Sequence, residues 1–246
     1  MGRPLVQRGN VGATLEPEAL SLIALGEQME LGFEALRRSP DAKRITGTVR
    51  VSASEGFMRP LTRVLARVQA KHPALALEIA AESRLADLAR READIGVRIV
   101  RTTSAAVIEK LMGRARVAAF AARSYIERRL PDARLPREVA GQHDWIGFDR
   151  VLAHLPQQQW MRAYGATRFV LRSTSPTALE EALIAGMGIG TLGVAQGAAL
   201  DLVRIETETM PPPVDVFIAF HRDVRNMPRV RVVVREIEAE IRRALA

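Results

Sequence analysis

The 246-residue sequence contains no cysteine. Disulfides, thiolate nucleophiles and thiolate metal sites are therefore excluded together, and the composition fits a reducing compartment. No run approaches the ~18 uninterrupted apolar residues that a membrane-spanning helix needs. The amino end has no long apolar core and no small-residue cleavage pattern, so it does not resemble a secretory signal. We expect a cytoplasmic protein that makes no membrane contact.

Aromatic residues make up only 4% of the chain, too few for a base-stacking platform. The formal net charge is nevertheless +8, and residues 84–137 carry thirteen basic and six acidic side chains, a surplus of 13 − 6 = +7. In this stretch arginines alternate with apolar residues in helix and strand patterns, which is typical of solvated faces. We therefore favour dispersed surface charge over a nucleic-acid patch, and expect the positive potential to attract a small anion.

Signatures of catalysis are also lacking. The four histidines are far apart in sequence, and neither G-x-S-x-G nor H-E-x-x-H occurs. Residues 188–193 spell G-x-G-x-x-G, but a dinucleotide loop must follow a strand and open a helix, whereas this segment follows a predicted helix and forms a strand itself. We interpret these glycines as close-packing positions, with Gly186 as the helix cap, and expect no catalytic residue, metal or cofactor.

An amphipathic helix is predicted over residues 17–38. Pro17 suits the first helical position. Apolar side chains recur at spacings of three and four, which places them on one stripe. The stripe consists of Leu22, Leu25, Met29, Phe33 and Leu36. Such a helix packs either against a partner helix or against its own domain, and the sequence leaves both open.

From Gly47 onward, predicted strands and helices alternate. Strands are predicted over 48–53, 75–80, 94–100, 117–121, 168–172, 188–192 and 214–220, and helices over 57–71, 85–91, 176–185 and 228–245. We expect Leu61, Val64, Leu65 and Val68 to face inward from helix 57–71, and Val232, Val233, Ile237 and Ile241 from the last helix. Strands joined by crossover helices imply a parallel sheet, and the pattern predicts two small α/β lobes.

Several short motifs then follow one another in a recognisable order. Gly47-Thr-Val-Arg-Val is similar to "G-x-L-R-I", and residues 87–98 are similar to "D-L-…-D-x-A-I-R". Leu111-Met-Gly, then residues 121–126, 136–144 and 185–190, continue the series. In this order and spacing the chain resembles the regulatory half of the LysR-type transcriptional regulators.

The resemblance implies an α/β, two-lobed fold like that of type II periplasmic binding proteins, with an N-terminal linker helix. It implies a small effector held between the lobes and a homodimer or higher homo-oligomer. Arg84, Arg98 and the predicted helix caps favour an anionic effector. The implied divisions are a winged helix-turn-helix remnant (1–16), a linker and dimerisation helix with hinge (17–46), lobe I (47–122 and 222–246) and lobe II (123–221).

The amino end departs from the family pattern. Leu5-Val-Gln-Arg and Leu15-Glu-Pro-Glu-Ala look like the end of the winged helix-turn-helix, but Glu16 and Ala19 replace threonine and glycine. The recognition helix that would reach base edges is missing. We expect this chain not to bind DNA specifically, and DNA to be a partner only if a helix-turn-helix lies upstream.

Candidate effector contacts follow the carboxyl ends of predicted strands, where ligands bind in open α/β sheets. They are Ser54, Glu55, Gly56, Phe57, Ser83, Arg84, Arg98, Ile99, Val100, Phe148, Ser173, Thr174 and Thr191. Some have an alternative structural role: Ser54 as a helix cap, Arg98 as a partner of Asp94, and Phe148 as core. In the second lobe, Ser175 and Pro176 are predicted as the N-cap and first residue of a helix. A solute-binding protein of the same fold, serving transport, is the alternative function, and an enzyme with an unrecognised site is the third.

Overall fold

A computed structural model describes residues 6–9, 12–15, 17–36, 45–81, 93–101 and 107–245. The chain divides into two compact units, Met1–Ile45 and Thr46–Ala246. The predicted helix 85–91, together with Ser83 and Arg84, lies outside the described residues.

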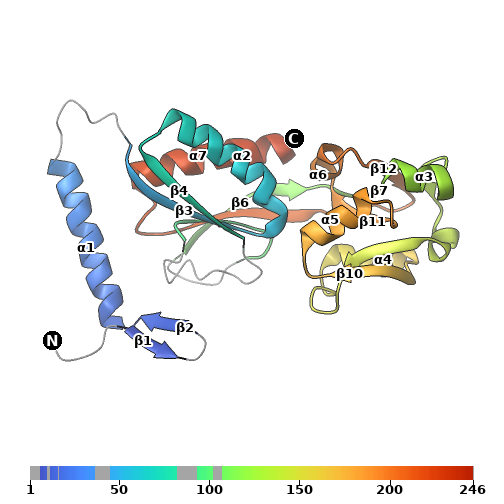
Figure 1. Cartoon of the computed structure of the whole chain (residues 1–246), viewed down its shortest axis with the longest axis horizontal. Coiled ribbons are helices and arrows are strands. Elements are labelled where there is room, and N and C mark those ends of the chain that lie inside the picture. The colour runs from blue at the N-terminus through green and yellow to red at the C-terminus, as the bar shows by residue number, and fades with distance from the viewer. Residues whose placement is uncertain are drawn as a thin grey trace. The chain divides into compact units, whose positions relative to one another are not determined.

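The first unit holds a β-hairpin and one helix (Figure 1). Strands β1 (Val6–Gly9) and β2 (Gly12–Leu15) pair antiparallel, and α1 spans Pro17–Leu36. Pro17 is the first helical residue, as predicted. Leu22, Leu25 and Met29 of the predicted stripe are 42%, 53% and 56% exposed. Leu20 and Ile23 are exposed as well, so the apolar surface of α1 is wider than the single stripe that was predicted.

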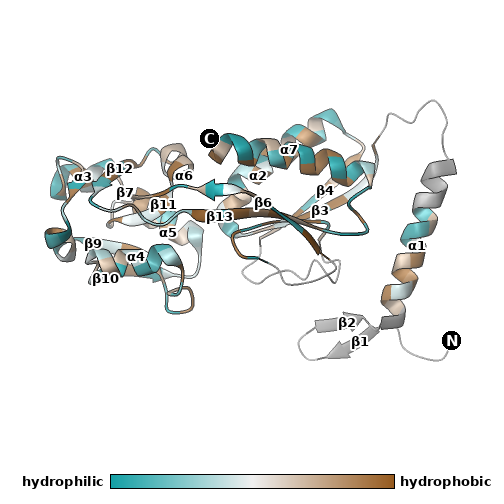
Figure 2. Ribbon diagram, turned by 180° about the vertical axis from the view of Figure 1, so that it is seen from behind, coloured by the Kyte–Doolittle hydropathy of each residue, from teal (hydrophilic) through white to brown (hydrophobic). Residues whose placement is uncertain are grey.

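The second unit contains a five-stranded sheet, here called the first sheet. Its order is β4-β3-β5-β13-β6, with bounds Leu75–Ala81, Gly47–Ala53, Ile95–Arg98, Val214–His221 and Val107–Ala115. Strands β4, β3 and β5 are parallel, but β13 runs antiparallel to β5 and β6. The parallel pairing predicted for strands joined by crossover helices is confirmed for β4, β3 and β5. Strand β13 has the opposite direction because it returns to this sheet from the second lobe. Figure 2 shows β13 as largely apolar.

Two helices lie side by side over the first sheet (Figure 1). Helix α2 (Met58–Lys71) follows a short 3-10 turn, η1 (Glu55–Phe57), and buries the four residues predicted to face inward. Helix α7 (Pro228–Leu245) buries Val230, Val233, Ile237 and Ile241; Val232 is only partly buried, so Val230 takes the place predicted for it. The ion pairs Arg67–Glu240 (2.6 Å) and Lys71–Glu236 (2.8 Å) join the two helices along their solvent side.

A second sheet has the order β11-β7-β12-β8, with bounds Gly190–Gly193, Val117–Ala121, Val203–Thr207 and Arg134–Leu135. A parallel pair, β9 (Asp144–Phe148) and β10 (Arg168–Ser173), accompanies it. The surrounding helices are α3 (Arg123–Arg129), η3 (Arg137–Gln142), α4 (Pro156–Tyr164), α5 (Pro176–Ile184) and α6 (Val194–Ala199). Trp145, fully buried, donates its indole N–H to the Ala140 carbonyl at 2.8 Å.

Strand pairing divides the chain earlier than the boundaries expected at 122 and 221. Strand β7 pairs with β11 and β12 in the second sheet, whereas β13 pairs with β5 and β6 in the first. The chain thus changes sheet at Arg116 and again between β12 and β13. Hydrophobic patterning identified both strands but does not specify the sheet that a strand joins, because pairing partners are distant in sequence.

The glycines after α5 have the structural role that was predicted for them. Gly186 has φ +72° and follows the C-cap residue of the helix, where a left-handed conformation is required. A Cβ on Gly188 would lie 2.5 Å from the backbone oxygen of Asp144. These glycines permit a tight helix end and close backbone approach.

Gly188→Ala should lower the free energy of unfolding by about 1–3 kcal/mol, because the backbone of β9 must move to admit the methyl group. Gly193→Ala is the matched control: a Cβ there would meet nothing closer than 3.8 Å. Urea denaturation followed by circular dichroism measures both. Equal midpoints for the two variants would contradict the close approach.

Candidate functional site

The candidate residues of the first sheet gather at one edge. Because β3 and β5 are parallel neighbours, their carboxyl ends lie together, and the Ser54 N–H donates to the Val97 carbonyl at 3.2 Å. This places Ser54, Glu55, Gly56 and Phe57 next to the strand that ends at Arg98 and continues into Ile99 and Val100. The loops predicted to share a ligand are therefore adjacent.

Ser54 occupies the N-cap position of η1, but its side chain makes no capping hydrogen bond. Its backbone oxygen instead accepts from the Phe57 N–H at 2.9 Å. The interpretation of Ser54 as a side-chain cap was therefore wrong, because the short 3-10 turn closes through the backbone.

Arg98 is a buried cation at the end of β5. Only 4% of its surface is exposed, and its guanidinium donates to Ser52 Oγ at 3.4 Å. The carboxylate of Asp94, the partner considered for Arg98, accepts the backbone N–H of Arg50 at 2.8 Å. By contrast, Val100 is half exposed, so the segment after β5 runs from the interior to the surface.

The candidates of the second lobe come from β9, β10 and β11. Ser173 and Phe148 are register partners at the carboxyl ends of the parallel strands β10 and β9. Phe148 packs against a core cluster, and the exposed Thr174 follows β10. Thr191 lies in β11, where its hydroxyl contacts the Met161 sulfur at 3.6 Å. The parallel bridge between Ile189 and Trp145 places β11 beside β9, the strand that ends at Phe148.

One side chain joins the two groups of candidates. Ser175 caps α5 as predicted, accepting the Ala178 N–H at 3.3 Å, with Pro176 as the first helical residue. The same Ser175 hydroxyl donates to Glu55 Oε1 at 2.8 Å, and the Thr177 N–H donates to that oxygen at 3.4 Å. The end of β3 and the start of α5 thus meet at the carboxylate of Glu55.

The electrostatics of this contact favour an ionised Glu55. Partial burial alone would raise the pKa of Glu55, but the hydrogen bonds from Thr177 and Ser175 outweigh it and lower the pKa below its ordinary value. The positive end of the α5 dipole acts in the same direction.

Sequence reasoning missed three residues beside this junction. The Arg59 guanidinium, in the first turn of α2, lies 3.6 Å from Glu180 Oε2 and 3.6 Å from Glu181 Oε1 of α5. Glu180 is buried, and its other oxygen accepts from Gln196 Nε2 at 2.6 Å. No sequence signal could have found this cluster, because its members lie on three helices distant in sequence.

The basic residues of segment 84–137 that the structure describes are distributed over both sheets and do not form one surface. Several have acidic or carbonyl partners: Lys110 with Glu238, Arg114 with Asp215, Arg134 with Glu206, Arg129 with the Gln142 carbonyl, and Arg137 with the Ala163 carbonyl. This arrangement agrees with dispersed surface charge.

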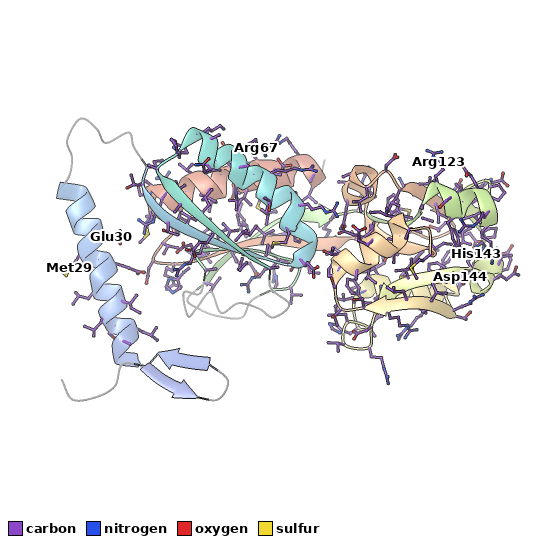
Figure 3. All side chains as sticks on the ribbon, viewed as in Figure 1. Met29, Glu30, Arg67, Arg123, His143 and Asp144 are labelled. Atoms are coloured by element: carbon purple, nitrogen blue, oxygen red, sulfur yellow. The ribbon has the colours of Figure 1, made fainter. Side chains whose placement is uncertain are left out.

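His143 is buried and lies directly before β9, next to Asp144 (Figure 3). The Tyr125 hydroxyl accepts the Asp144 N–H at 3.1 Å and lies 3.2 Å from Nδ1 of His143. The Tyr125 hydroxyl thus joins the backbone of Asp144 to the His143 ring. Burial, and then the nearby Arg129 cation, lower the pKa of His143.

This histidine should make stability depend on pH. Because its pKa is lower in the folded than in the unfolded chain, its contribution is complete above about pH 6.5 and is lost as the pH falls below that value, by at most ~1.4 kcal/mol per pH unit. Urea unfolding at about pH 7.5 and about pH 5.5 should show a smaller loss for His143→Gln than for the parent. The exposed His154 supplies the control, and His154→Gln should behave as the parent does. A parent-like loss in His143→Gln would contradict this interpretation.

A scan of protein families matches the LysR substrate binding domain over residues 42–242. The chain belongs to the LysR substrate-binding domain family.

Solved structures of LysR-type regulators share the fold. The CrgA regulatory domain of Neisseria meningitidis is similar with a TM-score of 0.64 at 16% identity, covering 82% of this chain and 100% of that one. The MexT regulatory domain of Pseudomonas aeruginosa is similar with a TM-score of 0.64 at 18% identity, covering 78% of this chain and 99% of that one. The CcmR regulatory domain of Synechocystis PCC6803, in complex with 2-PG, is similar with a TM-score of 0.62 at 16% identity. The match covers 79% of this chain and 97% of that one. A search of curated protein sequences found no match.

The LysR assignment confirms the predicted fold class and the predicted family. The family is one of transcriptional regulators, which are generally not enzymes. Among the described helices, none is long and apolar enough to cross a bilayer. Within the same residues, no group of three histidine, aspartate or glutamate side chains could hold a metal ion.

Proposed function

We propose that this chain is the effector-sensing and dimerising part of a LysR-type transcriptional regulator, acting in the cytoplasm. The observation that carries the proposal is the junction at Glu55, where the carboxyl-end loops of the first sheet meet α5 of the second lobe. A ligand bound there would touch both lobes and so bias their relative position, which is how binding at one place changes an attached domain. The LysR family supports this function, and no observation favours the transport alternative.

The proposed lobes follow the sheets, with changes near residues 116 and 213 in place of the expected 122 and 221. Residues 1–16 would belong to a winged helix-turn-helix and 17–46 to a dimerising linker. Specific DNA binding would need a complete helix-turn-helix, because base edges are read by its second helix.

We further propose a small anion as the effector. The candidates Ser54, Arg98, Ser173 and Thr174 offer hydroxyl donors and one buried guanidinium, a combination suited to carboxylate or phosphate groups. CcmR, which shares the fold, was solved in complex with 2-PG.

A thermal-shift screen of small organic acids tests this function. An acid present at 100 times its dissociation constant should stabilise the fold by ~2.7 kcal/mol, a rise of about 5 °C or more in the melting temperature. Thr174→Glu, which places a negative charge among the candidates, should abolish the rise. Thr62→Glu, the same change at an exposed position of α2, should retain it.

Two results would contradict the proposal. One is a screen in which no acid raises the melting temperature. The other is equal loss of the shift in Thr174→Glu and Thr62→Glu, since this would disconnect binding from the junction.

A further inference from the structure

The carboxylate of Glu55 reaches from the first sheet into the second lobe. Glu55 opens η1, immediately after β3, yet its hydrogen-bond donors are the Ser175 hydroxyl (2.8 Å) and the Thr177 N–H (3.4 Å). The first N–H groups of any helix lack partners within that helix. Glu55 therefore supplies α5 with an acceptor from an element about 120 residues away in sequence.

A second contact of opposite polarity lies close by. Here the first-sheet side contributes the cation, Arg59, and α5 contributes the carboxylates of Glu180 and Glu181, each at 3.6 Å. The side chain of Glu180 is only 6% exposed and is held from its other side by Gln196. Arg59 is about half exposed, so its pair is weaker than the Glu55 contact.

The two contacts are complementary in charge and sit one turn apart on the first-sheet side. The Glu55 carboxylate accepts hydrogen bonds at the start of α5, and the Arg59 guanidinium lies near two carboxylates of α5. Sliding α5 past η1 would separate both pairs at once. A shift that preserved one pair would strain the other, so together they define one relative position of the lobes.

We propose that Glu55 and Arg59 form an interlobe latch that holds the two lobes in the arrangement seen here, and that effector binding regulates the protein by releasing it. The second half of this statement rests on the proposed effector-sensing function; the first half does not. Glu55 is the main member of the latch, and Arg59 the supporting one.

The latch makes effector and Glu55 competitors. A ligand anion that bonds to the Ser175 hydroxyl or the Thr177 N–H must displace the Glu55 carboxylate, because both would need the same donors. The coupling is reciprocal, so whatever weakens the latch also changes the affinity for such a ligand.

Distance measurement between two spin labels tests the latch directly in the ligand-free protein. The chain has no cysteine, so labels attach only at introduced positions. Arg63→Cys on α2 and Arg162→Cys on α4 place one label on each lobe at exposed sites. The parent should show one narrow distance population by pulsed electron paramagnetic resonance.

Glu55→Ala should add a second population whose mean distance differs by more than about 2 Å. We expect its ratio to the first population to rise about threefold to tenfold over the parent, as removal of a partly exposed, charge-assisted hydrogen bond would give. Glu55→Gln should give a smaller rise, and Glu55→Ala with Arg59→Ala a larger one.

Glu78→Ala is the matched control, since Glu78 is also a surface glutamate in an ion pair, with Arg50 at 2.6 Å, but within the first sheet. It should leave the distances unchanged. An unaltered distribution in Glu55→Ala, or an equal change in Glu78→Ala, would overturn the latch. The distance measurement uses no ligand, so its outcome is independent of the thermal-shift screen. The latch could be absent from a protein that binds an acid, and present in a protein that binds none.

Discussion

Replacing Leu25 and Met29 of α1 with glutamine should convert the dimer that we propose for this protein to a monomer. Both side chains are more than half exposed and lie four residues apart on the predicted stripe. Figure 3 shows Met29 projecting from α1. Burial of each side chain contributes about 1.5–3 kcal/mol, and a twofold dimer buries each of them twice. We expect the dissociation constant to rise about a thousandfold or more.

Size-exclusion chromatography with light scattering measures this change as a fall from twice the 27.1 kDa chain mass to the chain mass itself. The double variant Glu27→Gln with Glu30→Gln introduces two glutamines into the same helix without removing apolar surface, and should stay dimeric. A dimeric Leu25→Gln/Met29→Gln protein would show that α1 is not the dimer contact.

Trp145→Ala should cost about 3–5 kcal/mol of unfolding free energy, the largest effect expected for a single substitution in this chain. Trp145 is fully buried in the core of the second lobe, and its indole N–H bonds to the Ala140 carbonyl. Its strand also forms a bridge to Ile189, just after α5. Truncation would leave a cavity in this core and remove one of the two hydrogen bonds that the Ala140 carbonyl accepts.

Trp160→Ala is the natural comparison, because Trp160 is only partly buried, stacking on Tyr164 at 4.8 Å between ring centroids and bonding to Thr209. We expect it to cost less than half as much. Urea denaturation followed by circular dichroism compares the two variants. Equal losses would mean that Trp145 is not the centre of this core.

Elements with a strong local signal were predictable from sequence. Helix α2 shows its four buried residues as a 3.6-residue period, and α5 is marked by its Ser175–Pro176 cap. By contrast, β6 was not predicted as a strand. It is an edge strand of mixed exposure, interrupted by Gly113 at φ +149°, so it shows no clean alternation.

The candidate site was predictable only in part, for a physical reason. Strand ends locate Ser54 and Ser173, because parallel strands place their carboxyl ends at one edge. The partners of Glu55 depend instead on how two lobes meet, and Ser175 is 120 residues distant. Arg59 and Glu180 resembled ordinary helix-surface charges until tertiary packing brought them within 3.6 Å.

Amide hydrogen exchange with and without a stabilising organic acid tests the effector-sensing function most directly. We expect new protection concentrated in residues 54–57, 98–100 and 173–177, with little change in the distant helix α3. Protection confined to other segments, or none at an acid concentration that saturates the thermal shift, would contradict it.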